Sequence, residues 1–303
     1  MENLDIGEQV RDTTDAVELT TRPNDPPMKP LVSIILPAYN AAAHIQKAID
    51  SVLTQTYTNW ELLAVNDGST DSTLDLLESF SDPRIQVFTH QNQGVSATRN
   101  LALRHATGDF FTFLDADDTL PPSCLEAYVE HAISNPRTDI FAGKVRVSEE
   151  RSGRVLRQWE SDFQGNPLSR FVRLSERVFF GVCLFLRSRD QKTYFRSGLT
   201  HCEDLLFFID YASQHETNYL GIPSLTYEQM VVSDSAMSDL RGLEAGYRQL
   251  YEAVCSIKNP CISRADRAYL RMRYTRIMIL SYLNAGMYRA ALNALFHFLH
   301  LKR

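Results

Sequence analysis

The chain has 303 residues, of which 44% are hydrophobic and 22% are charged. That hydrophobic content supports a sizeable core and excludes a chain that is disordered throughout. The formal net charge of -6 argues against nucleic acid as the main partner. The charge is uneven: residues 1–30 carry seven acidic and three basic side chains, net -4, whereas residues 243–303 carry three acidic and ten basic ones, net +7.

Five cysteines occur along the chain, an odd number, and no two form a Cys-X-X-Cys pair. We therefore expect free thiols in a reducing compartment, not a disulfide framework or a zinc site. Residues 1–30 are polar and contain four prolines, which predicts a disordered leader and not a secretory signal. Because no apolar run approaches the roughly 18 residues of a membrane span, we expect a cytoplasmic protein.

From residue 31 onward, short apolar runs alternate with segments of helical spacing. The run at 32–39 is almost continuously apolar, as in a strand that is buried on both faces. The predicted strands are at 32–39, 61–67, 85–89, 110–114 and 139–147, and the predicted helices are at 45–53, 71–80, 95–106 and 121–134. This alternation predicts crossover units and an α/β fold with a mostly parallel sheet flanked by helices.

The second half of the chain is less regular. Residues 150–200 show no clear pattern, 203–211 have helical spacing and 217–227 contain a predicted strand, whereas helical spacing dominates from residue 239 onward. The expected organisation is a leader at 1–30, an α/β domain at 31–235 and a C-terminal helical extension at 236–303. The α/β domain divides further into halves at 31–135 and 136–235.

Three predicted strand ends carry polar groups that the fold itself does not need: Pro37 to Asn40, Asn66 to Asp71, and Asp115 to Asp118. Ligands of open parallel α/β sheets bind outside the carboxyl ends of the strands, so these segments should converge on one edge. The segment from Asn66 to Asp71 is explained equally well by turn and helix-cap chemistry. Neither a GxGxxG nor a GxxxxGK[ST] motif occurs near the first strand, which disfavours dinucleotide and triphosphate loops.

The acidic segment Asp115-Ala116-Asp117-Asp118 directly follows the apolar run at 110–114. Carboxylates so close together repel one another, and a hard divalent cation relieves that repulsion. In an extended strand end, Asp115 and Asp117 point the same way, so one could reach a sugar hydroxyl or water and the other a metal ion. The alternative interpretation is a solvated acidic turn that caps the following helix.

Four blocks stand in series: VSIILPAYN at 32–40, VNDGSTD at 65–71, NQGVSATRN at 92–100 and GDFFTFLDADD at 108–118. In this order and spacing they resemble the family 2 glycosyltransferases, which have the GT-A fold and act on nucleoside-diphosphate sugars with inversion. The resemblance covers residues 31–135 strongly. A weaker match continues through FGVCLFLRS at 180–188 and HCEDLLFF at 201–208.

The resemblance implies roles for residues in the first three blocks. Pro37, Ala38 and Tyr39 would line the nucleobase pocket, with Tyr39 stacked near a uracil. Asp67 would bind the edge of the base, and Arg99 would lie near the nucleotide and its phosphates.

The remaining roles concern carboxylates. Asp115 would contact the ribose or a metal-bound water, and Asp117, beyond Ala116, would coordinate Mn²⁺ or Mg²⁺. Asp204 would be the base that deprotonates the acceptor hydroxyl, with Glu203 as its more structural neighbour. Without the resemblance, the pair would be interpreted as the charged start of a helix.

Two departures from the family pattern are visible. Many relatives begin the second block with two aspartates, and here Asn66 takes the first place. Many also carry a Tyr-Arg-X-His element whose histidine can touch the metal or the diphosphate. Tyr227-Glu228-Gln229-Met230 stands there instead. Since a thioether is a poor ligand for a hard cation, either the metal is held more weakly or another residue contributes.

The implied reaction transfers a sugar, expected to come from a UDP-sugar, to a hydroxyl of a glycan, lipid-linked or other acceptor in polysaccharide or glycoconjugate synthesis. One alternative is a non-catalytic nucleotide-sugar-binding subunit, against which the presence of Asp115, Asp117 and Asp204 argues. Another is a sugar nucleotidyltransferase, which would need a glycine-rich triphosphate loop that residues 31–40 lack.

The C-terminal region has five arginines at positions 264, 267, 271, 273 and 276, and residues 288–303 combine apolar and aromatic side chains with a basic end. One interpretation is peripheral contact with the anionic inner face of a membrane, which would suit a lipid-linked acceptor. The other is a helical subdomain packed on the rest of the chain or on a partner protein. The sequence leaves both open.

Overall fold

The computed structural model describes residues 29–178, 181, 183–189, 193–199, 201–231 and 239–300, without the side chains of 297–300. The predicted leader therefore lies outside the described residues except for its last two. These two are attached to the domain, because the Tyr57 hydroxyl donates to the Pro30 carbonyl and the Asn59 amide donates to the Lys29 carbonyl.

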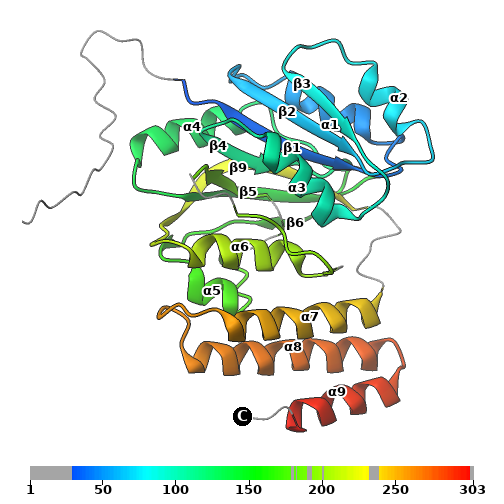
Figure 1. Cartoon of the computed structure of the whole chain (residues 1–303), viewed down its shortest axis with the longest axis vertical. Coiled ribbons are helices and arrows are strands. Elements are labelled where there is room, and N and C mark those ends of the chain that lie inside the picture. Colours follow the sequence, from blue (N-terminus) through cyan, green and yellow to red (C-terminus); the bar gives the residue numbers. More distant parts are fainter. Residues whose placement is uncertain are drawn as a thin grey trace, which may run out of the picture.

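The described residues form one nine-stranded sheet with helices packed on it and three further helices beyond (Figure 1). The strands are β1 Val32–Ala38, β2 Trp60–Asn66, β3 Ile85–Thr89, β4 Phe110–Phe113, β5 Ile140–Glu149, β6 Val155–Trp159, β7 Gln164–Gly165, β8 Phe185–Arg187 and β9 Tyr219–Val231. The helices are α1 Ile45–Leu53, α2 Thr73–Glu78, α3 Val95–His105, α4 Cys124–Ser134, α5 Leu168–Val172, α6 Glu203–Ser213, α7 Leu240–Ser256, α8 Arg264–Asn284 and α9 Tyr288–His300.

The strand order is β3-β2-β1-β4-β8-β5-β9-β7, with β6 paired to β5. The first four strands in this order are parallel, as predicted, and the α/β class is confirmed. The sheet as a whole is mixed, because β8 runs antiparallel to both β4 and β5, and β6 and β7 are also antiparallel to their neighbours. These three short strands lie in the segment 150–200, where the sequence pattern assigned no elements.

The centre of the core is formed by β1, β2 and β4. All residues of β2 and β4 are buried, and so are those of β1 apart from the partly exposed Pro37. Burying a Val, Leu or Ile side chain stabilises the fold by about 1.5–3 kcal/mol, which explains why these runs are almost continuously apolar. Pairing of Ala38 with Asn66, and of Ile35 with Phe113, brings the three polar strand ends to one edge.

Two predicted helices have different bounds in the structure. The helix expected at 121–134 begins three residues later, at Cys124, after a turn through the two prolines. The helix expected at 71–80 is shortened to α2, and Asp71 lies just before it. The Asp71 carboxylate accepts hydrogen bonds from the backbone N–H and the hydroxyl of Thr73, but the N-cap residue is Ser72, whose side chain makes no capping hydrogen bond.

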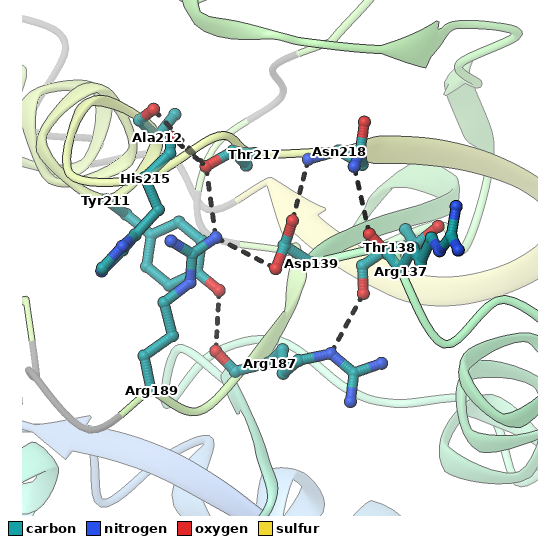
Figure 2. A network of polar contacts seen from close by, with 10 residues as sticks. All are labelled: Arg137, Thr138, Asp139, Arg187, Arg189, Tyr211, Ala212, His215, Thr217 and Asn218. Carbon is teal, nitrogen blue, oxygen red and sulfur yellow. Dashed lines mark hydrogen bonds and ion pairs between the residues drawn. The ribbon is translucent and has the colours of Figure 1, made fainter. Parts of the chain in front are cut away.

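A polar network holds together the opposite edge of the sheet (Figure 2). The Arg189 guanidinium forms an ion pair of 3.0 Å with Asp139, which precedes β5, and donates to Thr217, which precedes β9. The Tyr211 hydroxyl of α6 donates to the Arg187 carbonyl at 2.7 Å. The network therefore joins β5, β8, β9 and α6, which are the elements that carry the second half of the domain.

Helices α7, α8 and α9 lie one beyond another, progressively farther from the sheet (Figure 1). They share a small core of their own, formed by Leu243, Met278, Tyr282, Ala291 and Ala294. The helical character expected for this region is confirmed. Within the described ranges, no helix is both long and apolar enough to span a bilayer.

Asp266 attaches the C-terminal helices to the sheet domain. It forms a capping box with Ser263 at the start of α8 and also accepts hydrogen bonds from Ser169 and Arg173, which lie in and directly after α5. Burial by itself would raise the pKa of Asp266, but the hydrogen bonds from Ser263, Arg173 and Ser169 lower it to about 2.

We predict that Asp266→Asn lowers the free energy of unfolding by about 1.5–3 kcal/mol, since it weakens charge-assisted hydrogen bonds. The pKa of Asp266 is lower in the folded chain than the value near 3.9 of an unfolded aspartate, so the stabilisation is present above that value and lost as pH falls toward about 2. Urea denaturation at several pH values measures the difference. Glu160→Gln, which removes an exposed partner of Lys144, is the control and should change stability by less than about 1 kcal/mol. Equal effects of the two variants would contradict the prediction.

Candidate active site

A cavity of about 620 Å³ lies at the carboxyl edge of β1, β2 and β4. The eight residues predicted for nucleotide and metal binding all line it, namely Pro37, Ala38, Tyr39, Asp67, Arg99, Asp115, Ala116 and Asp117. Asn40, which the sequence analysis placed at a polar strand end, lines it too, and so do His44, Asn92 and Gly94, for which no role was predicted. The structure thus brings the predicted donor-site residues into one cavity, while Asp204 is not part of its lining.

Tyr39 lies at the mouth of the cavity, with 52% of its surface exposed, so one face of its ring is available for stacking. The next residue, Asn40, has a left-handed backbone with φ of 47°, which turns the chain away from β1. Its amide N–H donates to the Ser69 hydroxyl, and its side-chain oxygen accepts from the Thr70 N–H. The segment that follows β2 therefore fixes the segment that follows β1.

Asp67 is buried below the start of α3. Its two carboxylate oxygens accept hydrogen bonds from the backbone N–H groups of Gln93 at 2.8 Å and Gly94 at 3.0 Å. Gly68 has φ of +67°, and a side chain there would meet the Asn92 backbone at 2.7 Å, so the glycine is required. Asp67 therefore shapes the loop at 92–94, and the lone pairs that remain on its oxygens are available to a ligand.

Arg99 lines the cavity and is almost completely buried, with 5% of its side chain exposed. One terminal nitrogen lies 2.8 Å from Asp115, and the other lies 3.4 Å from Glu203 on α6. The guanidinium also faces the rings of Phe113 and Phe195. Burial opposes the charged form, but Asp115 and Glu203 outweigh it and raise the pKa of Arg99, which therefore stays protonated.

Asp118 is a structural acid, unlike its neighbours. Its carboxylate accepts hydrogen bonds from the Tyr227 hydroxyl and from the Met230 backbone N–H, both at 2.8 Å. The same Tyr227 oxygen accepts from the backbone N–H of Asp115. Burial, and after it the charge of Asp115, raises the pKa of Asp118 to about 8. The acidic segment is thereby attached to β9, and the sequence analysis missed this contact because 109 residues separate the two partners.

Asp117 is the acid of this segment that remains available. Burial and then the charge of Asp115 raise its pKa, whereas His44 lowers it. Within the described residues, Asp117 has no ion-pair partner, and no three His, Cys, Asp or Glu side chains cluster closely enough to hold a metal. A half-buried carboxylate of this kind suits Mg²⁺ or Mn²⁺, which are often bound by one or two carboxylates plus substrate phosphates. The site therefore fits a divalent cation that the ligand helps to coordinate.

His44 precedes α1 and contacts Glu150, which follows β5. Its Nδ1 lies 3.0 Å from a Glu150 carboxylate oxygen. The two residues come from opposite halves of the domain, and the sequence analysis missed both. The position of His44 just after a cavity-lining strand end was the available signal, but nothing local identifies Glu150 as its partner.

Glu203 and Asp204 form the first turn of α6. Asp204 accepts a hydrogen bond from the Leu205 backbone N–H at 2.6 Å, and the helix dipole favours both negative charges at this end. Burial raises the pKa of Asp204, an effect that Arg99 partly offsets. Burial and then Asp204 raise the pKa of Glu203. Asp204 is therefore linked electrostatically, through Arg99, to the acidic segment of the cavity.

Comparison with known proteins identifies a family and several relatives. Residues 33–195 match the family described as glycosyl transferase family 2. The chain is 34% identical over 159 residues to TuaG of Bacillus subtilis, named for teichuronic acid biosynthesis, which covers 52% of this chain and 58% of TuaG. It is 45% identical over 106 residues to the Escherichia coli glucosyltransferase WfgD, covering 35% of this chain and 42% of WfgD. The matches thus span about half the length of these relatives.

Two solved structures share the fold. Staphylococcus aureus TarS 1–349 in complex with UDP-GlcNAc has a TM-score of 0.67 and 21% identity, covering 88% of this chain and 80% of TarS. The mannosyltransferase PcManGT from Pyrobaculum calidifontis, in complex with GDP-Man and Mn²⁺, has a TM-score of 0.62 and 18% identity, covering 92% and 90%. At these identities the likeness establishes the arrangement of the elements.

We predict that Arg99→Met lowers the free energy of unfolding by about 3–5 kcal/mol, because it leaves Asp115 and Glu203 without their shared counter-charge. Adding Glu203→Gln should recover part of that loss, since it removes one of the unpaired charges. Urea denaturation of the two variants measures both effects.

The matched control is Arg177→Met, which removes the exposed partner of Asp162 and should cost less than about 1 kcal/mol. A loss in Arg99→Met no greater than that of this control would show that the buried ion pairs are not needed for stability.

Proposed function

The chain belongs to glycosyl transferase family 2 and has the GT-A fold, and on this basis we propose that it transfers a sugar from a nucleoside-diphosphate donor to a hydroxyl group. The observation that carries the proposal is the cavity at the carboxyl edge of the sheet, where the strand ends at Tyr39, Asp67 and Asp115 converge. The acceptor we propose is a glycan or lipid-linked sugar in polysaccharide or glycoconjugate synthesis. The names of TuaG and WfgD, the latter acting on a diphosphoundecaprenol-linked sugar, support this class.

The proposed donor is a UDP-sugar. TarS was solved with UDP-GlcNAc, and the name of WfgD specifies UDP-Glc. In our proposal the base stacks beside Tyr39, over the floor formed by Pro37 and Ala38, and its edge bonds to Asp67. Arg99 stays in its ion pairs and fixes Asp115 for the ribose or a metal-bound water.

Asp117 is the proposed ligand for a divalent cation, Mn²⁺ or Mg²⁺. The Mn²⁺ in the PcManGT structure and the half-buried, available carboxylate of Asp117 support this choice. Such a cation, when bound, would neutralise the charge that develops on the diphosphate leaving group.

Asp204 is the proposed general base. It would accept the proton of the acceptor hydroxyl as that oxygen bonds to the anomeric carbon, while the bond to the diphosphate breaks and its electron pair leaves with the diphosphate. A single displacement of this kind inverts the anomeric centre. Burial raises the pKa of Asp204, an effect that Arg99 partly offsets, and a higher pKa makes a carboxylate a stronger base. Arg99 and Glu203 would hold the start of α6 beside the donor.

We propose a division of roles along the chain to match. Residues 31–135 would bind the nucleotide, and residues 136–235 would bind the acceptor and supply the base. Residues 236–303 would place the enzyme on a membrane surface. Supporting the last role, α9 exposes Tyr288, Leu292 and Phe296 on one face, with 67%, 66% and 61% of their surfaces accessible. Exposed basic residues such as Arg289 accompany this face, and each adds about 1 kcal/mol near an anionic surface.

We predict that Asp204→Asn lowers turnover roughly 10²- to 10⁴-fold, because the base is lost. Nucleotide affinity should change little, since Asp204 does not line the cavity. Release of nucleoside diphosphate from a panel of sugar nucleotides, in Mn²⁺, Mg²⁺ or EDTA with candidate acceptors, measures turnover, and EDTA should suppress it.

The exposed Glu216, just after the same helix, provides the control Glu216→Gln, which should transfer sugar at the wild-type rate. Unchanged transfer by Asp204→Asn would rule out this mechanism, and transfer that EDTA does not affect would count against a metal at Asp117.

We also predict that the double variant Leu292→Asp/Phe296→Asp binds vesicles rich in phosphatidylglycerol roughly tenfold or more weakly than the wild type, because two apolar anchors become charged. Cosedimentation measures binding, and neutral phosphatidylcholine vesicles should bind the wild type less than anionic ones. Ile133→Asp, on α4 and 58% exposed, is the matched control. Equal binding by the double variant, or a wild-type dimer that the double variant loses, would overturn the membrane assignment.

A further inference from the structure

The donor cavity has few side chains that can balance a diphosphate. Among the residues that line it, Arg99 and His44 are the two that can carry positive charge, and they face the acids Asp67, Asp115 and Asp117. A nucleoside diphosphate would bring further negative charge into this acidic cavity. Its binding therefore depends on how many positive groups are free to meet it.

Arg99 is not free for this purpose. Its two terminal nitrogens are engaged by Asp115 and Glu203, and the side chain is almost completely buried. Turning the guanidinium toward a phosphate would leave the largely buried Glu203 and the partly exposed Asp115 without their shared counter-charge, at a cost of several kcal/mol. Of the two lining side chains that can carry positive charge, His44 is therefore the one that remains to contact the diphosphate directly.

The contact with Glu150 prepares His44 for such a role. An ionised carboxylate such as that of Glu150 has no proton to donate and acts only as a hydrogen-bond acceptor. In this contact the donor is therefore Nδ1–H of His44, which restricts the orientation of the ring. Within the described residues, no protein group is bonded to Nε2. An imidazole held at one nitrogen by a carboxylate presents the other nitrogen in a defined direction, as in sites where a carboxylate orients a binding histidine.

We propose that His44, oriented by Glu150, binds the diphosphate of the donor through Nε2. In this arrangement Nε2–H donates a hydrogen bond to a phosphate oxygen, while Glu150 holds the opposite edge of the ring through Nδ1. His44 thereby supplies, from the start of α1, a contact that Met230 cannot make with its side chain. The proposal rests on the proposed function, because it requires a nucleoside-diphosphate donor.

The test compares nucleotides that differ in one phosphate. Isothermal titration calorimetry with UDP and UMP, in EDTA and in Mn²⁺, is carried out on the wild type and on His44→Ala. We expect His44→Ala to weaken UDP binding about tenfold or more, the loss of one charge-assisted hydrogen bond, and to leave UMP binding within about twofold. The loss for UDP should persist in EDTA, because the contact is direct.

Glu150→Ala separates orientation from direct contact. It should weaken UDP binding less than His44→Ala does, and combining the two variants should add little, because without the ring Glu150 has no further effect. His215→Ala, an exposed histidine beyond α6, is the matched control and should bind UDP like the wild type. Circular dichroism melting verifies that each variant is folded.

Three results would overturn the proposal: equal losses for UDP and UMP, no loss for UDP, or a loss that appears only with Mn²⁺. The last would place His44 on the cation and not on the phosphate. If the wild type bound neither UDP nor GDP, the proposed function itself would fail, and the two failures are therefore distinguishable.

Discussion

The architecture of the site depends on one buried guanidinium. Arg99 projects from α3 and is held between Asp115, at the end of β4, and Glu203, at the start of α6. A charge buried to this degree is tolerated only where counter-charges surround it, so the two halves of the domain must meet at this point. The position of Asp204, next to Glu203, follows from the same contact. The donor cavity and the proposed base are therefore parts of one electrostatic unit, although they lie on segments about 100 residues apart.

The acids around this unit have separate tasks because their surroundings differ. Asp67 and Asp118 accept hydrogen bonds from groups of the chain itself, and each fixes a loop, although Asp67 also lines the cavity. Asp115 is paired with Arg99. Asp117 keeps a carboxylate that the described protein groups do not neutralise, which makes it the acid best placed for an added cation. The aspartates of the segment 115–118 thus have different roles: some fix the structure of the site, and Asp117 remains available to a ligand.

The sequence predicted the first four strands and their helices well, because apolar periodicity and caps are local signals. It also predicted that residues such as Tyr39, Asp67 and Asp117 share one edge, which follows from parallel strands. It did not predict the antiparallel β8, which is only three residues long, or the pairing of Asp118 with Tyr227. Contacts of this kind depend on which distant segments meet, and neither partner carries a local pattern that names the other.

The serial stack of α7, α8 and α9 also acts as a spacer. Neighbouring packed helices lie about 8–10 Å apart, so the two steps from α7 to α9 correspond to about 16–20 Å. In the proposed docking through α9, this distance sets the height of the catalytic cavity above the lipid headgroups. A lipid-linked acceptor sugar would have to extend from the headgroups toward that height. The thickness of the helical stack would thus affect how an acceptor reaches the site, independently of the residues that contact it.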